Sequence, residues 1–239
     1  MKLLVSVINE DEALEAIKGG CDILDIKNPK EGSLGANHPS ITRRIVELFK
    51  NKAKISVTIG DLPNLPGTAS LAALGAASLG VDYIKAGLYG VKSFNEALSL
   101  MDWIVKAVKE FYPEVKIIAC GYADYNLINS LNPINLPAIA YESNANGILI
   151  DVKNKTSKKL FQYLSLEALS GIIDKAHEYG LTVALAGALS KEDIGIVKKL
   201  KADIIGVRRC VCDKHKWLNG KVKSEKVKEM LIVIKSLNP

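Results

Sequence analysis

The chain alternates short apolar segments with longer amphipathic segments about eight times along its 239 residues. Short apolar segments are typical of buried strands, and amphipathic segments with a period near 3.6 are typical of helices. Strands that alternate with helices indicate a parallel sheet. About eight such pairs in a chain of this length predict an α/β fold closed as a (β/α)8 TIM barrel, with a single domain over residues 1–239.

The main alternative is an open, doubly wound sheet. That fold would have fewer strands or a glycine-rich dinucleotide-binding loop after the first strand, and Val7-Ile8-Asn9-Glu10 contains no glycine. The predicted strands cover residues 3–7, 22–27, 54–59, 82–86, 115–120, 148–152, 181–186 and 203–207. The crossover after the fifth strand is expected to be irregular, because Asn132, Pro133 and Pro137 interrupt it.

The composition, 48% hydrophobic and 24% charged, is that of a globular protein with a large core. No apolar run approaches the ~20 residues that span a bilayer, so we expect no membrane association. The N-terminal apolar run is too short for a signal peptide and turns acidic at once. With four scattered cysteines that we expect to be reduced, this pattern favours a cytoplasmic protein.

The formal net charge is +6, which suits either an anionic small molecule or a nucleic acid. Basic residues are spread along the predicted helices and aromatic residues make up only 6%, so we expect no nucleic-acid partner. Cys210 and Cys212 offer two thiolates near His215, but no second Cys or His pair with metal-ligand spacing follows, and we predict neither a metal nor a cofactor. We expect a homo-oligomer, although no motif specifies one.

The second predicted strand carries two charged residues on one face. Ile23, Asp25 and Lys27 alternate with Leu24 and Ile26, so the two sets point to opposite faces. Burying a carboxylate and an amine without partners costs on the order of several kcal/mol. The pattern is explained if both residues lie at the mouth of a barrel and face a pocket.

Other polar residues lie at the carboxyl ends of predicted strands, where TIM barrels place catalytic groups. The candidates are Asp25, Lys27, Lys85, Asp151 and Lys155. A lysine is a nucleophile only when neutral, and burial or a nearby cation lowers its pKa. Because Lys27 and Lys85 lie on alternate strands, we expect their amines to meet over one cavity, which suits Schiff-base chemistry. Solvated lysines and plain ion pairs are the alternative interpretation.

The loops after the seventh and eighth predicted strands indicate a phosphate site. Glycine lets backbone N–H groups approach an anion, a helix N-terminus favours negative charge, and arginine adds a bidentate donor. The candidates are Gly187, Ala188, Gly206, Val207 and Arg208. Tight turns without a ligand would give the same sequence pattern.

Three segments resemble one family, (5-formylfuran-3-yl)methyl phosphate synthase (4-HFC-P synthase), and the resemblance extends over essentially the whole chain. They are Asp25-Ile26-Lys27-Asn28-Pro29-Lys30-Glu31-Gly32-Ser33-Leu34-Gly35-Ala36, then Gly60-Asp61-Leu62-Pro63 with Pro66-Gly67-Thr68, and Tyr83-Ile84-Lys85-Ala86-Gly87. The resemblance implies a lyase of methanofuran biosynthesis that condenses two molecules of glyceraldehyde 3-phosphate, with loss of one phosphate and of water.

The resemblance also implies roles for the candidate residues. Lys27 would form the Schiff base, and Lys85 would transfer the proton that isomerises one triose phosphate. Asp25, Asp151 and Lys155 would support them. Two other hypotheses stay open: a class I aldolase acting on another phosphosugar, and a non-catalytic or nucleic-acid-binding role suggested only by the basic charge.

Overall fold

The computed structural model describes residues 1–155, 158–213 and 219–237. Eight parallel strands form a closed barrel in the order β1-β2-β3-β4-β5-β6-β7-β8, and β8 pairs with β1 to complete it. The strands are β1 (Lys2–Val7), β2 (Ile23–Ile26), β3 (Lys54–Pro63), β4 (Tyr83–Gly90), β5 (Lys116–Tyr122), β6 (Gly147–Asp151), β7 (Thr182–Leu185) and β8 (Ile204–Val207). The predicted (β/α)8 barrel is therefore confirmed.

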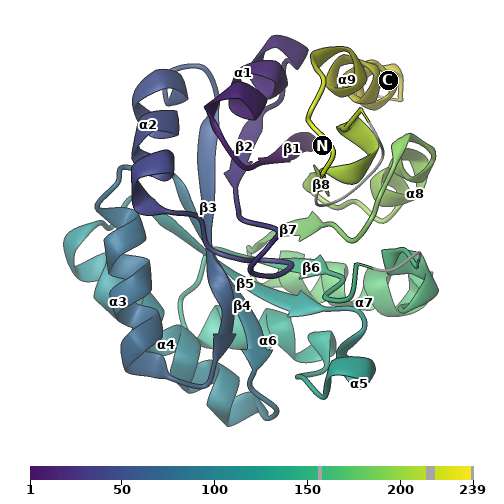
Figure 1. Ribbon diagram of the computed structural model, residues 1–239. Helices are drawn as coiled ribbons and strands as arrows, with labels where there is room; N and C mark the ends of the chain where they lie inside the picture. Colours follow the sequence, from purple (N-terminus) through teal and green to yellow (C-terminus); the bar gives the residue numbers. More distant parts are fainter. Residues whose placement is uncertain (156–157, 214–218, 238–239) are drawn as a thin grey trace.

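Helices surround the barrel (Figure 1), and the last of them, α9, packs against α1 beside the first strand. They are α1 (Glu10–Gly19), α2 (Pro39–Phe49), α3 (Pro66–Ala77), α4 (Phe94–Phe111), α5 (Tyr125–Ile128), α6 (Leu136–Glu142), α7 (Leu166–Glu178), α8 (Ile194–Lys199) and α9 (Ser224–Ser236). Short 3-10 turns are η1 (Pro133–Asn135), η2 (Leu160–Gln162), η3 (Lys191–Asp193) and η4 (Arg209–Val211). The crossover between β5 and β6 is split into α5, η1 and α6, as its prolines predict.

Two strands extend well beyond the predicted ones: β3 continues past Ile59 to Pro63, and β4 continues past Ala86 to Gly90. There Asp61 pairs with Gly87 and Pro63 with Gly90 of β4, across two shifts of register. Register shifts of this kind preserve strand pairing through a segment whose glycines and prolines look like a turn. The extension carries Asp61 to the carboxyl-terminal edge of the barrel.

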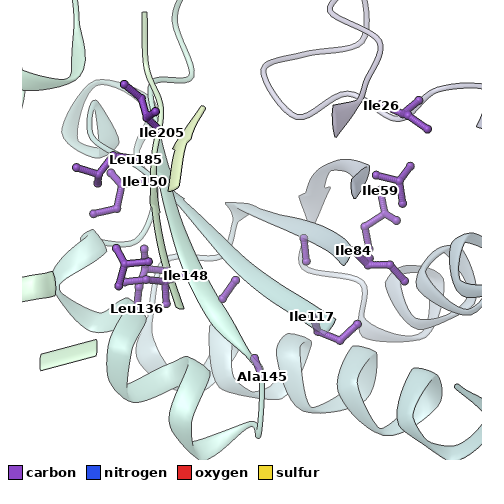
Figure 2. Packing of buried hydrophobic residues seen from close by; sticks show 14 of the residues in the cluster. Ile26, Ile59, Ile84, Ile117, Leu136, Ala145, Ile148, Ile150, Leu185 and Ile205 are labelled. Carbon is purple, nitrogen blue, oxygen red and sulfur yellow. The ribbon is translucent and has the colours of Figure 1, made fainter. Parts of the chain in front are cut away.

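The outward faces of the strands make the main hydrophobic core with the helices. Figure 2 shows Ile84 of β4, Ile117 of β5 and Ile205 of β8 among these buried side chains. The inward faces of the strands differ from the outward faces. Apolar residues such as Leu4 and Ile118 fill the interior of the barrel, and polar residues lie nearer the carboxyl-terminal ends of the strands. Side chains that alternate between the helix-facing core and the barrel interior explain why Asp25 and Lys27 share one face of β2.

A polar side chain recurs at the amino-terminal edge of the barrel before every even-numbered strand. Each one accepts a hydrogen bond from a backbone N–H of the preceding strand. The pairs are Asp22 with Leu3 at 2.7 Å, Asp82 with Ile55 at 2.8 Å, Asn146 with Ile117 at 2.9 Å and Asp203 with Val183 at 2.8 Å. The repeat joins the strands in pairs at the end of the barrel opposite the site, where barrel residues serve stability.

Candidate active site

One cavity opens among the carboxyl ends of the strands. It is lined by all of the residues that the sequence singled out: Asp25, Lys27, Lys85, Asp151, Lys155, Gly187, Ala188, Gly206, Val207 and Arg208. Lys27 and Lys85 therefore face the same space, as expected of residues on alternate strands. The structure brings together side chains from the first and last strands of the chain.

Asp25 and Lys85 form a buried ion pair at the base of the cavity. The Lys85 ammonium lies 2.7 Å from Asp25 Oδ1, in an approach that is an ion pair rather than an aligned hydrogen bond. Ser6 Oγ donates to Asp25 Oδ2 at 2.8 Å. Both charged side chains are almost fully buried, so each depends on the other for charge balance.

Asp151 is held at the end of β6 by three donors. Lys155 Nζ and the Val152 amide donate to Oδ1 at 2.7 and 2.8 Å, and Ser33 Oγ lies 2.9 Å from Oδ2. Burial raises the pKa of Asp151, but the ammonium groups of Lys155 and Lys27 outweigh it and lower this pKa to about 2. Asp151 is therefore a carboxylate at every pH at which the protein is expected to work.

Lys27 differs from the other lysines of the cavity because no carboxylate of the described residues forms an ion pair with it. Its Nζ donates to the backbone carbonyl of Ser33 at 3.3 Å, and its side chain is buried. Burial is the main reason that the pKa of Lys27 falls to about 8; the nearby cations Lys155 and Lys85 act in the same direction, and Asp151 partly opposes them. Lys27 thus loses its proton more readily than an ordinary lysine does.

The loop after β7 has a backbone suited to an anion. Gly187 and Ala188 both have positive φ, 102° and 59°, and this conformation is uncommon for alanine. Within the described part of the chain, the amides of Ala188 and Leu189 have no acceptor. Because both residues line the cavity, the loop can offer backbone N–H groups to a negatively charged ligand.

Arg208 lies at the edge of the cavity with its guanidinium directed at Glu12. The two terminal nitrogens donate to the Glu12 carboxylate at 2.6 and 3.1 Å, and one of them also donates to the carbonyl of Ser6 at 3.0 Å. The bidentate fork that we expected to bind a phosphate is therefore engaged by Glu12 in this structure. Arg208 therefore connects the loop after β8 to the start of α1 through Glu12. Gly206 and Val207, which precede Arg208 in the chain, line the cavity.

Several polar residues that support the site were not predicted from the sequence. Ser6 binds Asp25, Ser33 binds Asp151, and Glu12 binds Arg208. Ser6 carried a detectable signal, because it is a polar residue on the inward face of an apolar strand. Ser33 lies in a loop, where a serine has no periodic pattern to mark it.

A second missed cluster surrounds Asp61, beside the same edge of the barrel. The hydroxyl of buried Tyr122 donates to Asp61, the Leu34 amide donates to it at 3.3 Å, and Lys153 Nζ lies 3.3 Å away. Burial raises the pKa of Tyr122 well above its usual range. Asp61 therefore fixes the loop between β2 and α2 in place over the barrel.

No cluster of three His, Cys, Asp or Glu side chains is arranged to bind a metal within the residues that the structure describes. His215, which we considered beside Cys210 and Cys212, lies outside those residues. Among the described helices, none is both long and apolar enough to cross a membrane.

The fold and the cavity define a TIM-barrel protein whose carboxyl-terminal edge carries buried lysines paired with aspartates. The family model for 4-HFC-P synthase matches residues 3–231, and the chain belongs to this family. The chain is 46% identical over 229 residues to the (5-formylfuran-3-yl)methyl phosphate synthase of Methanopyrus kandleri, covering 96% of this chain and 97% of the relative. It is 49% identical over 212 residues to the protein of the same name from Methanosarcina acetivorans, covering 89% and 91%.

Solved structures support the fold. KGPDC from Streptococcus mutans superimposes with a TM-score of 0.67 at 14% identity, covering 100% of this chain and 99% of that one. A 3-hexulose-6-phosphate synthase gives a TM-score of 0.66 at 16% identity, covering 98% and 100%. At such low identity these similarities concern the barrel alone.

Proposed function

We propose that this protein is a lyase that makes (5-formylfuran-3-yl)methyl phosphate from two molecules of glyceraldehyde 3-phosphate, for methanofuran biosynthesis, through a Schiff base on Lys27. Family membership supports the product. The observation that carries the mechanism is the state of Lys27: it is a buried amine with a lowered pKa and no carboxylate partner among the described residues.

The other cations of the cavity are less suited to this role. Lys85, Lys155 and Arg208 each have a carboxylate partner within 2.7 Å. An ion pair favours the charged ammonium, which is not a nucleophile. Lys27 therefore attacks the carbonyl carbon of the triose phosphate as a neutral amine, and loss of water gives the Schiff base.

The charged pairs supply the remaining steps. The Lys85–Asp25 pair moves a proton at the carbon next to the carbonyl, which isomerises one triose phosphate. The Asp151–Lys155 pair faces the same cavity and stabilises the protonated Schiff base through its carboxylate. The amides of Ala188 and Leu189 hold a substrate phosphate, and Gly206 and Val207 line the cavity beside them on the neighbouring strand.

The proposal is tested by incubating the purified protein with glyceraldehyde 3-phosphate and measuring inorganic phosphate release together with the mass of the organic product. We expect one phosphate released for each furan product formed. The Lys27→Arg variant keeps a positive charge at this position but has no amine for Schiff-base formation, so its rate should fall to that of a reaction without enzyme.

Two outcomes would contradict the proposal. A product that retains both phosphates and has the mass of a simple aldol adduct would indicate an aldolase instead. Full activity in a folded Lys27→Arg variant would exclude Lys27 as the nucleophile.

A further inference from the structure

The loop between β2 and α2 is packed into the mouth of the barrel by contacts along its length. The carbonyl of Gly35 accepts a hydrogen bond from Thr58 Oγ1 at 2.7 Å, and the Leu34 amide donates to Asp61 at 3.3 Å. The Leu34 side chain is only 1% exposed and joins the apolar cluster of the barrel interior. Ser33, next to these anchors, is therefore held in a fixed position at the cavity.

Ser33 contacts two charged residues of the cavity with different atoms. Its backbone carbonyl accepts from Lys27 Nζ at 3.3 Å. Its hydroxyl lies 2.9 Å from Asp151 Oδ2 and 3.0 Å from the carbonyl of Val152. A hydroxyl has one proton to donate, and a carboxylate is a stronger acceptor than a carbonyl, so we assign the proton to Asp151.

The two oxygens of Asp151 are held very differently. Oδ1 accepts from Lys155 Nζ and from the Val152 amide, whereas Ser33 Oγ is the donor that the described residues provide to Oδ2. The Lys27 ammonium has three donors and uses one on the Ser33 carbonyl. If Ser33 lost its hydroxyl, Oδ2 would be a buried acceptor with Lys27 as a nearby cation able to satisfy it.

We propose that Ser33 is a positioning residue whose hydroxyl holds Asp151 Oδ2 against the β6 side of the cavity and so keeps Lys27 without a carboxylate partner. Its role in catalysis depends on the proposed function, because a free amine matters only if Lys27 is the nucleophile. The structural part of the proposal, that Ser33 sets the distance between Asp151 and Lys27, does not depend on the proposed function.

Loss of this hydroxyl has a predictable electrostatic effect. Lys27 is faced by Asp151 and Asp25, which favour its ammonium form, and by Lys155 and Lys85, which oppose it. A carboxylate that moves into contact raises the pKa of a lysine by roughly 1–2 units. For Ser33→Ala we therefore expect the neutral fraction of Lys27 at pH 7 to fall by about 10- to 100-fold.

The test is to label the protein with trace acetic anhydride between pH 6 and 11 and to quantify acetylated Lys27 by mass spectrometry. The pH at half-maximal labelling should rise by roughly 1–2 units in Ser33→Ala. Ser143→Ala is the matched control, since Ser143 is also buried and its hydroxyl donates to the Ile139 carbonyl at 2.7 Å, in α6. It should leave the Lys27 titration unchanged.

A double variant separates positioning from a structural effect. If Ser33 acts through the charge of Asp151, then adding Ser33→Ala to Asp151→Asn should cause no further rise in the Lys27 titration. A Ser33→Ala protein that is folded but titrates like the wild type would overturn the proposal, as would an equal rise in both backgrounds. Because labelling needs no substrate, these outcomes are independent of whether glyceraldehyde 3-phosphate is the true substrate.

Discussion

Replacing Lys27 with methionine should make the protein more stable at pH 7 while abolishing its activity. The pKa of Lys27 is about 8 in the fold, against 10.5 for an ordinary lysine. At 1.36 kcal/mol per pKa unit, keeping this ammonium buried costs roughly 3 kcal/mol. Methionine has a similar length and no charge, so it removes this cost.

The pH dependence follows from the direction of this shift. Because its pKa is lowered, Lys27 binds fewer protons in the folded protein than in the unfolded chain between pH 8 and 10.5, and its contribution to wild-type stability rises with pH over that interval. The gain from Lys27→Met should therefore be full below pH 8 and should disappear above about pH 10.5.

Urea unfolding at pH 7 and pH 11 measures this difference, and Lys85→Met is the matched control. Lys85 is equally buried but is paired with Asp25, so its replacement should destabilise the protein by leaving Asp25 unpaired. A Lys27→Met protein that is less stable than the wild type at pH 7 would contradict the claim that Lys27 is buried at a cost.

The second large effect is expected for Asp25→Asn. Asparagine keeps the shape and can still accept the hydrogen bond from Ser6, but it leaves the Lys85 ammonium buried without a counter-charge. Breaking a buried ion pair in this way costs about 3–5 kcal/mol. The midpoint of urea unfolding should fall accordingly, and adding Lys85→Met to Asp25→Asn should recover much of the loss.

Asp102→Asn provides the comparison for an exposed pair. Asp102 lies 2.7 Å from Lys106 one turn along α4, on the outer surface of that helix. Its replacement should change stability by no more than about 0.5 kcal/mol. If Asp25→Asn were as mild as Asp102→Asn, the two charges of the Asp25–Lys85 pair would not depend on each other as the structure indicates.

Most of the charged residues involved in these effects could be predicted from the sequence. The alternation of strands and helices was enough to predict the barrel, because closure of eight βα units places every strand end at one edge. Asp25, Lys27, Lys85 and Asp151 could be singled out because each interrupts or ends an apolar strand. Their spacing along parallel strands then required them to meet.

What the sequence did not reveal depends on contacts between distant loops. Ser33 binds Asp151 across 118 positions, and Arg208 binds Glu12 across 196. The sequence around each residue does not identify its partner. Glu12 is also typical of a helix N-terminus, and Arg208 is also typical of an anion-binding site. The path of the β2–α2 loop depends on Gly32 lying close to Asp61 and on Gly35 lying close to the carbonyl of Asn28, and this path decides the contact between Ser33 and Asp151.

We infer that Lys27, which forms no ion pair with a carboxylate among the described residues, is the amine that forms the covalent intermediate. Borohydride reduction in the presence of glyceraldehyde 3-phosphate, followed by peptide mapping, tests it most directly. We expect a single reduced adduct on Lys27, and none on Lys85 or Lys155. An adduct on either of the paired lysines, or no adduct in a preparation that makes the furan product, would contradict it.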